Sequence, residues 1–223
     1  MSDQRAGAAL LRLLTWLSPA FPVGAFVWSG GLERAVHDRW VSDADGLKGW
    51  ITTALFHGAG WNDAVFFAEA WRKANDLAAL GDLAELAAAL AGSRERHQET
   101  LALGEAFLTA AAAWAEPFAE RTGGRIAYPV AVGAVAGQTG VPLADALAGY
   151  LHAAASQMVS AGLRLGVCGQ KQGVALLAAL EGPILDLAAK AAASTLDDLG
   201  SAAIRAEIAV MRHETQYSRL FKS

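Results

Sequence analysis

The stretch PLADALAGYLHAAASQMVSAGL, residues 142–163, decides the fold class. Its large apolar side chains recur every few positions, as Leu143, Leu147 and Leu151 illustrate. A period of about 3.6 residues places such side chains on one face of an α-helix. Pro142 suits a helix start, because the first turn has no partner for the N–H that proline lacks. The stretch therefore predicts a helix that buries one face in a core.

The rest of the chain follows the same helical pattern, and no segment alternates apolar and polar residues as a half-buried strand would. Hydrophobic residues make up 54% of the 223 positions, and alanine and leucine, both strong helix formers, dominate them. We predict helices over 6–17, 30–39, 43–60, 62–79, 82–92, 94–115, 129–138, 142–163, 170–181, 183–197 and 201–216. No linker divides them. The expected fold is one all-α domain over residues 1–223, a bundle of about ten helices.

Local signals predict where three of these helices begin. Ser42 and Asp45 have the spacing of a capping box, and Asn62 is a residue type that caps the next helix. Pro183 suits the first turn of a further helix. These signals therefore place helix starts near residues 43, 62 and 183.

Composition excludes several classes of function. A formal charge of −4 leaves no basic surface for nucleic acid. The single cysteine excludes a disulfide scaffold and fits a reducing compartment. Prolines and polar residues interrupt every apolar run, so we expect a cytoplasmic protein without a signal peptide or membrane span. Charged residues form only 18% of the chain, against about 25% in an average domain, which favours an oligomer that covers apolar surface. A GC-rich genome is the alternative explanation of this composition.

No motif builds a catalytic, cofactor or metal site. The string GVCGQK, residues 166–171, lacks the Gly-Lys-Ser/Thr order of a phosphate-binding loop. The five histidines include no pair spaced to place two imidazoles on one helix face. An enzyme that uses Cys168, or a histidine beside a carboxylate, stays open as an alternative, although a lone cysteine is more typical of a core.

Two internal segments depart from the alanine-rich and leucine-rich background. The first is the loop SPAFPVGAF, residues 18–26, whose prolines and aromatic side chains indicate either a structural loop or a partner contact. Its candidate residues are Ser18, Pro19, Phe21, Pro22, Gly24 and Phe26. The second is the joint at 164–173, where Arg164 and Lys171 follow a long apolar run. Arg164 either complements the dipole at a helix end or borders an interface.

The third unusual segment is the tail RHETQYSRLFKS, residues 212–223. If the tail were helical, Tyr217 would lie beside Leu220 and Phe221, a pattern that anchors a helix in a partner's groove. A frayed terminus is the alternative. The candidate docking residues are His213, Glu214, Tyr217, Arg219, Leu220 and Phe221.

The loop at 18–26, the following SGGLE at 29–33 and the tail at 212–223 together resemble the UreF family of urease accessory proteins. The likeness spans the whole length, since it also includes the joint at 164–173. This chain departs from the usual family pattern at Val27-Trp28, at Gly30 and at Val167-Cys168. The last departure implies that Cys168 is not a functional residue of the family.

The resemblance implies a chaperone for nickel insertion into apo-urease. Family members are all-helical, form dimers and join UreD, also called UreH, and the GTPase UreG, which handles the GTP and drives nickel delivery. Tyr217, Arg219, Leu220 and Phe221 would then contact UreD or UreG. Arg164 and Lys171 would face the GTPase or the dimer partner.

The resemblance also implies that the chain has no cofactor of its own. A nickel carrier that binds the metal through His213 is a further alternative.

Overall fold

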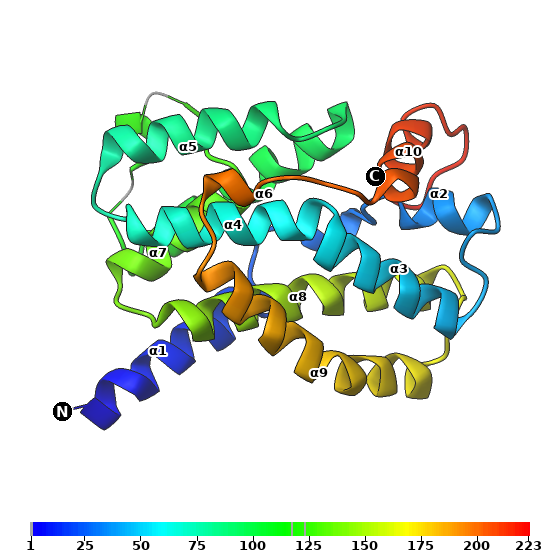
Figure 1. Ribbon diagram of the computed structural model, residues 1–223, viewed down its shortest axis with the longest axis horizontal. Coiled ribbons are helices and arrows are strands. Elements are labelled where there is room, and N and C mark those ends of the chain that lie inside the picture. The colour runs from blue at the N-terminus through cyan, green and yellow to red at the C-terminus, as the bar shows by residue number, and fades with distance from the viewer. Residues whose placement is uncertain (1, 117, 123) are drawn as a thin grey trace.

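Helices form most of the computed structural model, which describes residues 2–116, 118–122 and 124–223 (Figure 1). Within this described part there are ten α-helices, three short 3-10 turns and no strand, which confirms the all-α prediction. The helices are α1 (Ser2–Trp16), α2 (Leu32–His37), α3 (Ala44–His57), α4 (Ala59–Arg72), α5 (Leu77–Ala89), α6 (Arg94–Ala111), α7 (Tyr128–Gln138), α8 (Leu143–Arg164), α9 (Gln170–Ala192) and α10 (Ile204–His213). The 3-10 turns are η1 (Ala25–Val27), η2 (Ala119–Thr122) and η3 (Leu196–Asp198).

The core is built on the contact between α4 and α7. Every residue of α7 from Pro129 to Ala136 is buried. A Cβ atom added at Gly133 would lie 2.4 Å from the main-chain oxygen of Phe67, so the two helices touch backbone to backbone. Only glycine permits so close an approach.

The helix predicted over 142–163 is α8, and it packs along α9 (Figure 1). As the period predicts, Leu147 and Leu151 are fully buried. One apolar cluster runs from Ala9 in α1 to Phe221 in the tail, so the described residues form a single domain. Among them, no helix is both long and apolar enough to cross a membrane.

The predicted break at residue 182 is wrong, because α9 continues through Pro183 to Ala192. A proline inside a helix leaves the carbonyl four residues earlier without its N–H partner. Here both Pro183 and Ala179 are exposed, so water can satisfy that carbonyl. The solvent-facing position explains why the helix tolerates the proline.

Two predicted caps are also wrong. Asp43 caps α3 in place of Ser42, and its Oδ1 accepts a hydrogen bond of 2.8 Å from the Gly46 N–H. Helix α4 begins before Asn62, whose Oδ1 instead accepts a 2.8 Å hydrogen bond from the Gly200 N–H. The Asn62 side chain therefore holds a distant segment against α4.

Candidate functional site

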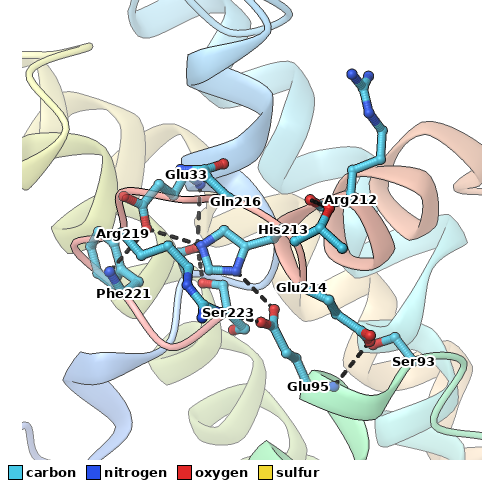
Figure 2. Close-up of polar contacts among 12 residues, drawn as sticks. Glu33, Ser93, Glu95, Arg212, His213, Glu214, Gln216, Arg219, Phe221 and Ser223 are labelled. Atoms are coloured by element: carbon cyan, nitrogen blue, oxygen red, sulfur yellow. Dashed lines mark hydrogen bonds and ion pairs between the residues drawn. The ribbon is translucent and has the colours of Figure 1, made fainter.

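Three helix ends meet where the tail returns to the bundle (Figure 2). Glu33 lies in the first turn of α2, and Glu95 lies in the first turn of α6. His213 is the last residue of α10. Helix dipoles favour anions at N-termini and cations at C-termini, so each of the three side chains suits its helix end.

His213 lies between the two glutamates and is fully buried. Its Nδ1 is 2.8 Å from Glu95 Oε2, and its Nε2 is 3.1 Å from Glu33 Oε2. Each ring nitrogen thus lies within hydrogen-bonding distance of a carboxylate oxygen, so the ring bridges the two acidic side chains.

The same two glutamates bind the tail that follows α10. Glu33 Oε1 accepts a hydrogen bond of 2.7 Å from the Leu220 N–H, and Glu33 Oε2 accepts one of 2.9 Å from the Phe221 N–H. Glu95 Oε1 accepts a hydrogen bond of 2.9 Å from Arg219 Nη1. The tail is thus joined through charged groups to α6, about 120 positions earlier, and to α2, about 190 positions earlier.

The last residues of the tail lie against the loop before α2. The Lys222 N–H donates to the Val27 oxygen at 2.7 Å, and the Ser29 N–H donates to the main-chain oxygen of Ser223 at 2.8 Å. The Ser29 hydroxyl contacts the same Ser223 oxygen. Ser223 is fully buried. The tail is therefore a docked element of the fold, and α10 does not extend into it.

Arg164 joins the loop and the tail from the end of α8. Its guanidinium carbon lies 4.1 Å from the centre of the Phe221 ring, and its Nη1 donates to the main-chain oxygen of Phe26. A cation above an aromatic face is attracted to it. Gln157, two turns earlier, supports the same loop with a hydrogen bond of 2.7 Å to the Ala25 oxygen.

Comparison with known proteins shows which family this chain belongs to. The family model described as UreF matches residues 41–181. Proteins named urease accessory protein UreF from Agrobacterium fabrum and Rhizobium etli are each 60% identical to this chain, over 100% of both chains. The chain belongs to the UreF family. A relative of the same name from Mesorhizobium japonicum is 54% identical, again over the full length of both chains.

The UreF-like tail presents some of its candidate residues to solvent and buries others. Tyr217 is fully exposed, Leu220 is 55% exposed, and the Arg219 side chain is 40% exposed. Phe221 and His213 are buried. The accessible candidates in the tail therefore narrow to the three exposed side chains.

Glu214 and Lys171 are two further candidates: Glu214 follows the last residue of α10, and Lys171 lies near the start of α9. Glu214 Oε1 accepts a hydrogen bond of 2.8 Å from the Arg94 N–H and so helps to cap α6. Lys171 is exposed in the first turn of α9 and lies outside the tail contacts described above. Glu214 thus has a structural contact, whereas Lys171 presents a cation to solvent.

The loop at 18–26 combines buried and exposed side chains along its length. Phe21 is buried, with its ring centroid 5.7 Å from that of Phe107, and Gly24 has the left-handed φ of 75°. Ser18 Oγ accepts a hydrogen bond of 3.1 Å from the Ala20 N–H. The exposed members are Pro19, Pro22 and Phe26, the last with 63% of its surface accessible. Phe21 therefore anchors the loop.

Sequence reasoning missed the two glutamates that organise this site. Glu33 stands in the SGGLE string, but no local pattern links it to His213, 180 residues later. Glu95 has an ordinary explanation as an acidic residue in a first helical turn. The only available signal was an acid at each of two helix starts together with a histidine near a helix end.

The alternatives based on Cys168 and His213 gain no support from the geometry. Burial raises the pKa of the Cys168 thiol, which disfavours the reactive thiolate. The ring nitrogens of His213 both face carboxylates and the ring has no solvent access. The residues that the structure describes include no group of three or more His, Cys, Asp or Glu arranged to hold a metal ion.

A second charged cluster begins at Arg96, the residue directly after Glu95 in α6. Arg96 donates to Asp63 Oδ2 at 2.5 Å and to Glu99 Oε2 at 3.1 Å, and the Tyr150 hydroxyl donates to Asp63 Oδ2 at 3.2 Å. Burial raises the pKa of Glu99 despite the opposing effect of Arg96, and burial together with the Asp63 charge raises the pKa of Tyr150. A neighbouring cavity of about 40 Å³ holds at most a few waters. This cluster joins α4, α6 and α8.

Proposed function

We propose that this chain acts in urease maturation, as an accessory protein for nickel insertion into apo-urease. The observation that carries the proposal is 60% identity, over the full length, to proteins named urease accessory protein UreF. Nickel would be cargo, and the chain would have no cofactor of its own. The working unit would be a homodimer in the cytoplasm, in complex with UreD, also called UreH, and the GTPase UreG.

The exposed part of the docked tail supports a role in partner binding. Tyr217, Arg219 and Leu220 combine an aromatic ring, a guanidinium and an apolar side chain on one short segment. Aromatic and arginine side chains are enriched among the residues that dominate binding energy at interfaces. We assign these three residues to the contact with UreD or UreG.

The chain would gate GTP hydrolysis by UreG. A protein that binds one nucleotide state of a GTPase more tightly shifts the equilibrium between the states of the GTPase by that difference in affinity. Arg164 is a poor candidate for an arginine that reaches into the GTPase, because its guanidinium is engaged with Phe221 and Phe26. Differential binding therefore explains the coupling better than a catalytic arginine does.

Reconstitution tests the proposal directly. Apo-urease, UreD, UreG, nickel, bicarbonate and GTP are combined with and without this chain, and urease activity is measured. We expect activity to rise only with the chain present, and Tyr217→Ala to lower the rise while Lys48→Ala, on α3, leaves it unchanged. Equal activity without the chain would contradict the proposal.

A further inference from the structure

We propose that Glu33 is a positioning residue for partner binding: its carboxylate holds the tail in a fixed register, in which Leu220 faces outward and the partly exposed Arg219 reaches Glu95. This inference rests on the proposed function, because it assigns the means by which the docking surface is presented. Glu33 itself is only 7% exposed, so it acts through the tail and not by touching a partner.

The hydrogen-bond arrangement at Glu33 is the first argument. Its two carboxylate oxygens accept from the N–H groups of Leu220 and Phe221, and Oε2 also makes a hydrogen bond with Nε2 of His213. Two successive main-chain N–H groups on one carboxylate fix both the position and the direction of the backbone. Bonds of this kind to a charged acceptor are stronger than neutral ones.

The alternation of exposure along the tail is the second argument. Leu220 and Lys222 are exposed, whereas Phe221 and Ser223 are buried. Such alternation is that of an extended segment with one face against the protein. A shift by one residue would bury Leu220 and expose Phe221. The carboxylate binds at positions 220 and 221 and therefore selects which face is presented.

The contacts of Arg219 and Phe221 also depend on this register of the tail. Arg219 reaches Glu95, and Phe221 lies beneath the Arg164 guanidinium. Both contacts need residues 220 and 221 to be where Glu33 holds them. Loss of the Glu33 charge should therefore release the tail from Arg219 to Ser223.

Glu33→Gln is the appropriate test, because it keeps the side-chain volume and removes one acceptor oxygen and the charge. The amide nitrogen would face a donor, so at least one of the three hydrogen bonds is lost. Glu105→Gln is the matched control, since Glu105 has 66% of its side chain exposed and pairs with Arg125 on the surface. Each variant is measured as the full chain.

Two readouts separate positioning from general stability. In hydrogen exchange of the free chain, Glu33→Gln should speed exchange of the Leu220 and Phe221 amides at least about tenfold, and amides of α4 and α7 should keep their rates. In the reconstituted mixture, the concentration of chain needed for half-maximal urease activation should rise by a similar factor. Glu105→Gln should change neither.

A covalent rescue completes the experiment. The Lys222 N–H bonds to the Val27 oxygen at 2.7 Å, which places these residues side by side. A disulfide from Val27→Cys with Lys222→Cys, in a Cys168→Ser background, should hold the tail in place without Glu33. In Glu33→Gln it should restore both amide protection and activation under oxidising conditions, and its reduction should remove both.

Unchanged exchange at Leu220 and Phe221 in Glu33→Gln would overturn the proposal, as would a released tail that activates normally. Failure of the formed disulfide to restore activation would also overturn it. If the wild-type chain fails to activate urease while the exchange results follow expectation, the fault lies with the proposed function, and the tail register set by Glu33 still holds.

Discussion

Helix α6 carries two charged networks that begin at the consecutive residues Glu95 and Arg96 and have different consequences. Glu95 points to the tail, where it pairs with His213 and Arg219. Arg96 points into the bundle, where it pairs with Asp63 and Glu99. The first network joins helix ends to a non-helical segment, whereas the second joins three long helices along their sides.

The two charged networks therefore have different roles. The one that joins helices stabilises the bundle, whereas the one that joins the tail positions the exposed side chains of the tail. Helices α4, α6 and α8 are also held by apolar packing, so a carboxylate left unpaired there stays between the helices, with only 13–21% of its side chain exposed. The tail has fewer apolar anchors, of which Phe221 is the main one. Breaking its network can release the segment and leave the bundle intact.

The largest expected effect is that of Arg96→Met, which removes the cation and leaves two carboxylates unpaired. We expect the free energy of unfolding to fall by about 2–3 kcal/mol, because two carboxylates with only 13–21% of their side chains exposed then lack their cation. Urea denaturation measures this. Arg125→Met is the control, since the 55% exposed Arg125 should contribute less than about 1 kcal/mol. A loss for Arg96→Met as small as that of the control would show that the bundle network is dispensable.

His213→Leu should have an intermediate effect. It leaves Glu33 and Glu95 without the ring between them, and the tail can move away so that water reaches both carboxylates. We expect a loss of about 2 kcal/mol in the free energy of unfolding, together with faster proteolysis after Arg219. A global loss as large as that of Arg96→Met, with the tail still protected, would remove the distinction between the two networks.

Arg164→Ala should weaken tail docking more modestly. It removes the cation above the Phe221 ring and the hydrogen bond to Phe26, together worth about 1 kcal/mol. Hydrogen exchange of the Phe221 amide should rise several-fold. Lys171→Ala, at the exposed start of α9, should leave that amide unchanged. Equal effects of the two substitutions would show that Arg164 does not hold the tail.

The smallest effect on stability is expected for Tyr217→Ala. Its ring is fully exposed, so thermal denaturation should shift by less than about 0.5 kcal/mol in free energy. A substitution that lowers urease activation without changing stability would mark a contact residue. A clear loss of stability would instead show that Tyr217 packs against the protein.

The sequence predicted the bundle better than the tail site, for a physical reason. Apolar periodicity is local, so the buried positions Leu147 and Leu151 of α8 could be inferred from neighbouring residues. The Glu33–His213 contact joins groups 180 positions apart, and no local pattern encodes such a pairing. The break expected at Pro183 was wrong because only the fold shows that this residue faces solvent.

Amide hydrogen exchange along the tail of the free wild-type chain tests the central claim most directly. The docked tail predicts slow exchange at Leu220, Phe221 and Lys222, whose N–H groups donate to Glu33 or Val27. It predicts fast exchange at the exposed Tyr217. Exchange at unfolded-chain rates from Tyr217 through Ser223 would contradict the account, since the tail would then have no fixed register before a partner binds.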